Sequence, residues 1–212
     1  MRGIATIAII AGVIIAGLAS VLISGRQVGT PTPSALIEAA YPLVTGQVQN
    51  FILYDTPQAA PEIAFQDGDN KDLDLTDFRG QYVLLNFWAT WCGPCKREMP
   101  SLDRLQAQMG GKNFYVLALS EDRTGLDDVK EFFTDFELVD LDIYIDDTGA
   151  SSRIFSVGGL PATVLLDPAG NIVARMIGPA EWDAPETIAF LEHFSAATAD
   201  GRSADLVSGP NE

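Results

Sequence analysis

Residues 86–95 of the sequence are NFWATWCGPC, and this stretch decides the fold. It overlaps a nearly continuous apolar run over residues 82–88, which is typical of a central strand covered on both faces. Pro94 suits the first turn of a helix, because its missing N–H would have no partner there. We therefore predict a buried strand that turns into a helix over residues 94–109, with Cys92 at the helix N-terminus.

This placement favours dithiol chemistry at Cys92 and Cys95. Unpaired N–H groups and the helix dipole stabilise a thiolate, so Cys92 is predicted to attack a client disulfide. Cys95, one turn deeper, would then attack Cys92 and release the reduced client. Gly93 lets the backbone turn without a side-chain clash. A structural disulfide is the alternative, but a bridge that closes so short a loop removes little unfolded-state entropy.

Strands and helices alternate around this stretch, which predicts an α/β fold with a mixed sheet and helices on both faces. An N-terminal hairpin is expected over residues 65–75, where Asp67-Gly68 would supply the positive φ of the turn. Asp183 is the predicted N-cap of the last helix. The other helices and strands are expected over residues 114–119, 126–136, 141–145, 148–155, 162–166, 172–177 and 184–197.

The N-terminal segment has the composition of a membrane anchor. Residues 4–23 are uncharged and long enough to cross the hydrocarbon core, so a single transmembrane helix is predicted within residues 1–25. A cleavable signal peptide is the alternative, because the small residues Gly17 and Ala19 offer a possible cleavage site, but the apolar run continues past them. We expect a single-pass inner-membrane protein whose soluble domain lies in the periplasm.

Three regions are predicted after the anchor. Residues 26–60 contain several prolines among small and polar residues, which favours an extracytoplasmic linker in which residues 34–41 could form a short helix. The folded domain is expected over residues 61–197. The small and polar residues 198–212 are expected to form a flexible tail.

The composition excludes several functions. The net charge of −16 would repel phosphate backbones, so no nucleic-acid partner is expected. One histidine, His193, and two cysteines are too few for a His-rich metal centre or a conventional zinc finger. Lys96 follows Cys95, which excludes c-type haem attachment through C-x-x-C-H. We predict no cofactor and no metal site.

Further motifs accompany the cysteine pair, and they are DFRG at 77–80, EMPSL at 98–102 and GLPAT at 159–163. With them the sequence resembles the thioredoxin superfamily over residues 61–197, and within it the anchored extracytoplasmic branch that includes TlpA, ResA and CcmG. TlpA looks most similar, because GPAEW at 178–182 also resembles its C-terminal region. The resemblance implies a protein-disulfide reductase kept reduced by a membrane thiol-electron donor. Its clients would be disulfides of apocytochrome c, or of a copper chaperone or oxidase subunit, during maturation of cytochrome c or a copper centre.

The resemblance also implies a proton-handling carboxyl group near the cysteines. Asn86 stands where thioredoxin has a buried aspartate, and an amide cannot exchange a proton in that role. Glu98 matches a functional glutamate of the ResA-like branch and shares a helix face with Cys95, so it is expected to take the role. The alternative is an ordinary first-turn glutamate favoured by the helix dipole.

Client binding is expected around a proline. Pro161, which follows Leu160, resembles the cis-proline of the superfamily that faces the cysteines and lets a client backbone pair beside them. Together with these two residues, Trp91, Gly93 and Pro94 are predicted to form the client surface. Trp88 is predicted to belong to the core instead.

Two other functions use the same cysteines. A copper(I)-delivery module is the main alternative, because paired thiolates bind Cu(I), although nothing in the sequence turns His193 toward them. A peroxidase is the weaker alternative, because the peroxiredoxin pattern has Thr or Ser three residues before the reactive cysteine and Ala89 stands there.

Overall fold

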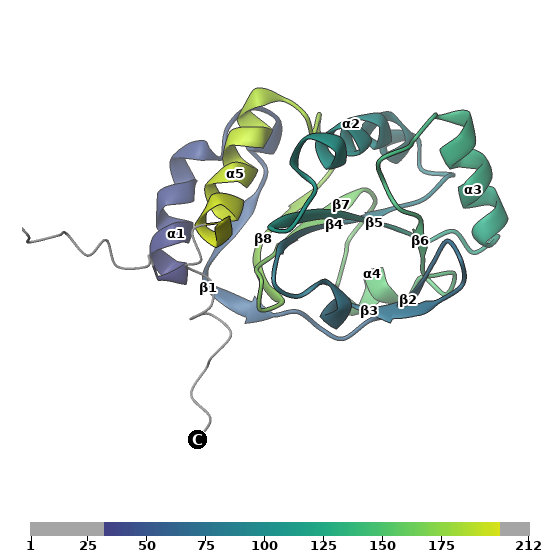
Figure 1. Cartoon of the computed structure of the whole chain (residues 1–212), viewed down its shortest axis with the longest axis horizontal. Helices are drawn as coiled ribbons and strands as arrows, with labels where there is room; N and C mark the ends of the chain where they lie inside the picture. The colour runs from purple at the N-terminus through teal and green to yellow at the C-terminus, as the bar shows by residue number, and fades with distance from the viewer. Residues whose placement is uncertain (1–31, 200–212) are drawn as a thin grey trace, which may run out of the picture. The chain divides into compact units, whose positions relative to one another are not determined.

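The computed structural model describes residues 32–199, which form an eight-stranded mixed sheet with helices on both faces (Figure 1). The strands lie in the order β1-β8-β7-β4-β5-β6-β2-β3. Their bounds are β1 Ile52–Ala59, β2 Ala64–Asp67, β3 Asp72–Asp74, β4 Tyr82–Trp88, β5 Phe114–Ser120, β6 Tyr144–Ile145, β7 Ala162–Leu166 and β8 Asn171–Ile177. The helices are α1 Pro33–Ala40, α2 Gly93–Met109, α3 Leu126–Asp135, α4 Ala150–Ile154 and α5 Pro185–Ala199, and 3₁₀ turns occupy Tyr41–Leu43, Gly46–Val48 and Leu75–Phe78. The predicted mixed sheet is confirmed.

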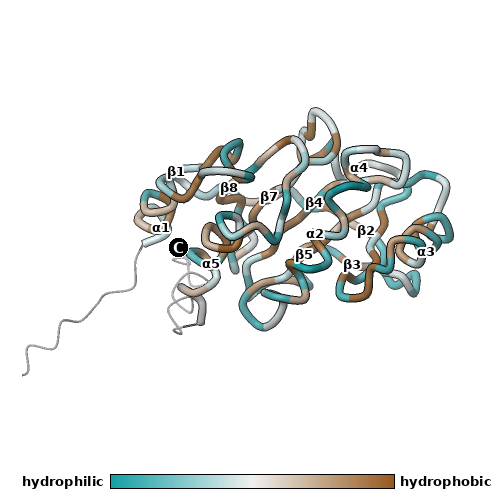
Figure 2. The backbone as a smooth tube through the Cα atoms, turned by 90° about the horizontal axis from the view of Figure 1, so that it is seen from above, coloured by the Kyte–Doolittle hydropathy of each residue, from teal (hydrophilic) through white to brown (hydrophobic). Residues whose placement is uncertain are grey.

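The central strand β4 separates two hydrophobic cores. It pairs in parallel with β5 and antiparallel with β7, and every one of its residues is buried. Side chains alternate between the faces of a strand, so Leu84 and Trp88 join the core under α2, while Leu85 and Phe87 join the other. Figure 2 shows hydrophobic residues along these central strands, as the apolar run over residues 82–88 predicts.

The two cores are covered by different elements. Helices α2, α3 and α5 cover the first core, where the Trp88 ring lies 5.0 Å from the Phe132 ring. The second core lies under the β2–β3 hairpin and α4, where Phe155 packs 5.3 Å from Phe87. Figure 1 shows α2 and α5 on one side of the sheet and α4 on the other.

The short helix expected over residues 34–41 is confirmed as α1, but the rest of the predicted linker is wrong, because residues 41–59 form two 3₁₀ turns and the edge strand β1. Strand β1 pairs antiparallel with β8, and Phe51 stacks on Phe190 of α5 with ring centroids 5.0 Å apart. Helix α1 contacts α5 through the Leu36 carbonyl, which lies 2.8 Å from Nε2 of His193. The prolines of this region suggest a spacer, but the apolar residues between them are buried against α5, and burial of apolar surface outweighs the weak local propensities.

Three local expectations also differ from the structure. The positive φ of the hairpin turn is at Asn70, at 62°, and not at Gly68. Strand β6 has two residues, so the predicted strand over residues 141–145 is too long. Helix α5 begins at Pro185, and the carboxylate of Asp183 accepts hydrogen bonds from Arg104, so Asp183 is not the N-cap.

The predicted tail and the predicted membrane anchor lie at the two ends of the chain. Helix α5 extends to Ala199, two residues into the predicted tail, and the rest of that tail lies outside the described residues. The predicted anchor over residues 1–25 also lies outside them. Between residues 32 and 199, none of the helices has both the length and the apolar character that crossing a membrane requires.

Candidate active site

Cys92 and Cys95 form a disulfide at the start of α2, with their Cα atoms 5.2 Å apart. Cys92 is the N-cap of the helix, and its Sγ accepts a hydrogen bond from the backbone N–H of Cys95 at 3.3 Å. Cys92 is 6% exposed and Cys95 is fully buried. The sulfur that a client can reach is therefore that of Cys92, beside the N–H groups that stabilise a thiolate.

The turn from β4 into α2 is fixed by a buried aspartate that the sequence analysis did not identify. The carboxylate of Asp122 accepts hydrogen bonds from the backbone N–H and the hydroxyl of Thr90, at 2.8 and 2.5 Å. It also accepts one from the hydroxyl of Ser120, at 2.7 Å. Asp122 follows the end of β5, the parallel neighbour of β4. The C-terminal ends of both strands therefore lie beside the cysteine loop. This arrangement holds the loop before Cys92.

A buried polar cluster lies on α2 one turn beyond Cys95. Glu98 is 2% exposed, and its Oε1 accepts a hydrogen bond of 2.9 Å from Nδ2 of Asn86. The same Asn86 nitrogen donates to the hydroxyl of Thr163 on β7 at 3.0 Å. Asn86 therefore connects the carboxyl group to the strand that follows the cis-proline, and Thr163 is a member that the sequence analysis did not single out.

The loop before α5 closes this cluster. Oε2 of Glu98 accepts hydrogen bonds from the backbone N–H of Ala180 at 3.1 Å and from the indole N–H of Trp182 at 3.0 Å. The backbone N–H of Trp182 donates to the Ser101 hydroxyl at 3.0 Å. Trp182 is fully buried. Its GPAEW motif was the available signal, but the sequence did not pair this tryptophan with Glu98.

Burial raises the pKa of Glu98 from 4.5 to about 7, and the hydrogen bonds from Asn86, Trp182 and Ala180 oppose this rise because they stabilise the ionised form. A carboxyl group with this pKa can gain or lose a proton near neutral pH. Together with Cys95 three residues earlier on the same helix, it gives the site a group suited to proton transfer.

The predicted client surface lies around Trp91. The Leu160–Pro161 peptide bond is cis, as predicted. Trp91 is 68% exposed, and with Gly159 and Leu160 it lines a groove of about 280 Å³. Trp88 is fully buried in the core, as expected. Contact of a client with Gly93, Pro94 and Pro161 stays a prediction.

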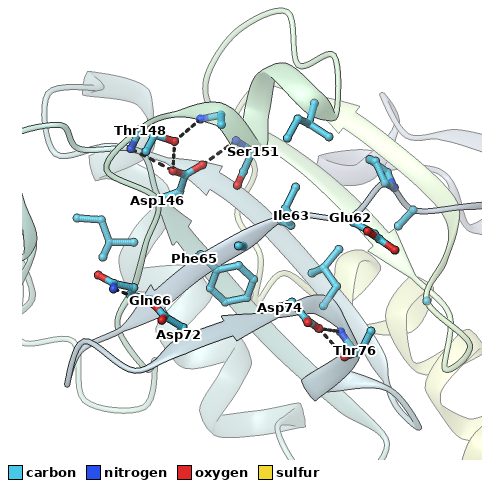
Figure 3. A pocket seen from close by; sticks show the side chains of 18 of the residues that line it. Glu62, Ile63, Phe65, Gln66, Asp72, Asp74, Thr76, Asp146, Thr148 and Ser151 are labelled. Atoms are coloured by element: carbon cyan, nitrogen blue, oxygen red, sulfur yellow. Dashed lines mark hydrogen bonds between the residues drawn. The ribbon is translucent and has the colours of Figure 1, made fainter.

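A larger cavity of about 1040 Å³ lies among elements of the second core (Figure 3). Its wall includes Phe65 and Ile63 of that core, and its rim carries Asp74 and Asp146. The two carboxylates bind their own turns, since Asp146 accepts from Ser151 N–H at 2.7 Å and Asp74 from Thr76 N–H at 2.6 Å. The cysteines belong to the first core, so this cavity is separate from the disulfide site.

Metal ligands do not gather around the cysteines within residues 32–199. No group of three or more His, Cys, Asp and Glu side chains there has the arrangement of a metal site. His193 lies on α5, where its ring nitrogen is within hydrogen-bond distance of the Leu36 carbonyl. Within the described residues, the copper alternative therefore has the two cysteines and no metal-binding group of three or more His, Cys, Asp and Glu side chains.

Known proteins are similar to this chain in sequence and in fold. A sequence model of the AhpC/TSA family matches residues 56–175, which is more than half of the chain. The thiol-disulfide oxidoreductase ResA of Bacillus cereus is 36% identical over 119 residues, covering 56% of this chain and 68% of the relative. ResA of Oceanobacillus iheyensis is 32% identical over 136 residues, covering 62% and 70%. The thioredoxin domain of a thiol-disulfide oxidoreductase from Bacteroides vulgatus superposes with a TM-score of 0.56 at 27% identity, covering 65% of this chain and 96% of that one.

Proposed function

This chain belongs to the AhpC/TSA family and has a thioredoxin-like fold, and from that premise we propose that it reduces disulfides of client proteins outside the cytoplasm. Thiol-disulfide exchange is its chemistry, as in the ResA relatives. The observation that carries the proposal is the asymmetry of the pair, because Cys92 is reachable at the start of α2 while Cys95 is buried behind it.

The proposed reaction begins with the pair in the dithiol state. The thiolate of Cys92 attacks one sulfur of the client disulfide, which forms a mixed disulfide and releases the other client sulfur as a thiolate. The thiolate of Cys95 then attacks Sγ of Cys92, and the second client sulfur leaves. The client gains two electrons and two protons, and the chain ends with the Cys92–Cys95 disulfide.

Glu98 supports the second step by accepting a proton. The thiol of Cys95 must lose its proton before it attacks, and Glu98 is the buried titratable group one turn further along α2. Its raised pKa matches a base that works near neutral pH. Asn86 and Trp182 position this carboxyl group through their hydrogen bonds.

Restoring the dithiol requires two electrons from a reductant, and we propose that a membrane thiol-electron donor supplies them. The support is the resemblance of the cysteine, EMPSL and GLPAT motifs to the anchored extracytoplasmic branch. The same resemblance favours clients in the maturation of cytochrome c or of the oxidase copper centre. Residues 4–23 would hold the protein in the inner membrane with its domain in the periplasm.

The topology has a direct test. Full-length protein should fractionate with inner membranes, and protease added to spheroplasts should digest its domain, because the apolar run over residues 4–23 is long enough to remain as an anchor. A mature N-terminus near Ser20 would show that the segment is a cleaved signal peptide.

The direction of exchange is tested by the reduction potential. We expect the Cys92–Cys95 couple to titrate at about −200 mV or below against glutathione, in the range of reducing dithiols. The reduced full-length protein should then convert a disulfide-bonded C-x-x-C-H peptide of the apocytochrome type to its dithiol faster than dithiothreitol at equal concentration. A potential near about −120 mV, the range of strong oxidants, would assign the opposite direction.

A further inference from the structure

The groove beside Trp91 is bounded by two elements that carry basic residues. One wall contains Arg123, from the segment that follows β5, and the other contains Arg153, from the last turn of α4. Trp91 and Leu160, which we place on the client surface, line the same groove. A client whose sulfur reaches Cys92 would therefore present its neighbouring side chains to the two arginines.

The two guanidinium groups approach one another. Nη1 of Arg153 and Nη2 of Arg123 lie 3.5 and 3.7 Å from the single point that a Cβ of Gly149 would occupy. The two nitrogens are therefore no more than about 7 Å apart, and like charges at such a separation repel. A bound anion between them would relieve this repulsion and could accept hydrogen bonds from both.

Neither charge is neutralised by the part of the chain that the structure describes. Arg123 donates no hydrogen bond to that part of the chain. It forms no salt bridge there either, because both salt bridges among the described residues belong to Arg104. Arg153 donates only to the uncharged carbonyl of Thr148, at 3.3 Å. The groove also contains Glu121, but its carboxylate accepts from the backbone N–H of Ser152 at 2.8 Å and has no arginine within salt-bridge distance. Two free positive charges at this site contrast with a net charge of −16 for the whole chain.

We propose that Arg123 and Arg153 form a subsite for an acidic side chain of the client, located close in sequence to the cysteine that Cys92 attacks. This inference rests on the proposed function and adds a specificity to it. The occupant is an Asp or Glu carboxylate of the client polypeptide, because the groove adjoins the exposed Trp91 next to the attacking cysteine. Arginine is suited to this task, since its planar donor pair matches the two oxygens of a carboxylate.

The test uses synthetic peptides with one disulfide, in which a single Glu is moved through the positions beside the cysteines and compared with Gln at the same position. At the matching position, we expect the Glu peptide to be reduced about threefold to tenfold faster, as exposed ion pairs contribute modestly. The difference should shrink when NaCl is raised from about 20 to about 500 mM, because salt screens exposed charges.

Variants of the full-length protein connect the preference to the arginines. Arg123→Gln should lose most of the preference for Glu, and it should fold normally because no described hydrogen bond is removed. Arg123→Glu should favour a Lys peptide instead. Arg153→Lys, which keeps the charge, should retain part of the preference. Lys112→Gln is the charge-matched control, because exposed Lys112 precedes β5 while Arg123 follows it, at the opposite end of that strand.

A neutral small substrate, hydroxyethyl disulfide, separates the two proposals. Arg123→Gln should reduce it at the rate of the unchanged protein, since it carries no carboxylate. Equal rates for Glu and Gln peptides at every position would overturn the arginine subsite and leave the reductase intact. A preference for the Glu peptide that survives in the double variant Arg123→Gln/Arg153→Gln would also overturn the arginine subsite. A protein that reduces neither the peptides nor hydroxyethyl disulfide would overturn the proposed function and the subsite with it.

Discussion

Replacement of Cys95 by serine is expected to leave the protein joined to its client. In this variant Cys92 still attacks, but no second thiolate remains to displace the client from Cys92. Multiple-turnover reduction should fall to the uncatalysed background, while one equivalent of client accumulates as a mixed disulfide. Non-reducing electrophoresis and mass spectrometry after incubation with an oxidised client peptide would measure the adduct.

The matched variant is Cys92→Ser, which keeps the buried sulfur of Cys95 and removes the reachable one. It should trap no client, because the remaining thiol is fully buried behind the first turn of α2. An adduct through Cys95 in Cys92→Ser, with none through Cys92 in Cys95→Ser, would reverse the assignment of the two sulfurs.

The second large effect concerns how stability depends on pH. The folded protein binds the proton of Glu98 more tightly than the unfolded chain, because burial raises its pKa from 4.5 to about 7. The stabilisation is therefore complete below about pH 4.5 and is lost as the pH rises toward 7, by about 3 kcal/mol in total. Glu98→Gln does not titrate, so its free energy of unfolding should lack this fall. Urea denaturation of the oxidised protein from about pH 4.5 to 8 measures it.

Four aspartates with lowered pKa values affect stability at a lower pH than Glu98 does. The pKa values of Asp67, Asp74, Asp146 and Asp183 are lowered, so their contributions to stability are lost only as the pH falls below the ordinary range of an aspartate. A parallel pH dependence of the Glu98→Gln variant and the unchanged protein would show that Glu98 does not carry the effect.

Trp182→Phe provides the matched comparison for Glu98→Gln. It keeps the carboxyl group but removes one donor that stabilises the ionised form, so the pKa of Glu98 should rise further. The stability loss should be larger at pH 8 than at pH 5, since hydrogen bonds to charged groups contribute about 1.5–3 kcal/mol. The same two variants in stopped-flow thiol exchange test the proton-transfer role. An exchange profile that is unchanged in Glu98→Gln would make Glu98 an ordinary buried residue.

The sequence was sufficient to predict those features of the fold and site that depend on residues close together in the chain. The apolar run of β4, the glycine and proline between the cysteines and the spacing of Cys95 and Glu98 all lie within seventeen residues, so they predict strand, helix start and shared face directly. The cis bond at Pro161 followed from the resemblance of its motif. The difference in exposure between Cys92 and the fully buried Cys95 follows from the same local pattern.

Longer-range pairings could not be predicted in this way. Trp182 reaches Glu98 across 84 residues, and no periodicity in the sequence indicates which loop closes over a buried carboxyl group. Asp122 has the appearance of a surface aspartate until β5 brings it beside Thr90. Residues 41–59 were misassigned to a linker because their prolines are local features, whereas their burial depends on β8 and α5 far along the chain.

Strand β1 also has a consequence for how the protein avoids self-association. Without β1, the backbone of β8 would become an open edge with unpaired N–H and C=O groups, a template on which another chain can add a strand. β1 covers that edge and is itself a poor template, because Pro57 lacks an N–H and the register with β8 shifts between Leu53 and Gln58. A soluble fragment begun at residue 61 would therefore be prone to aggregate, whereas one begun at residue 32 would keep its protected edge.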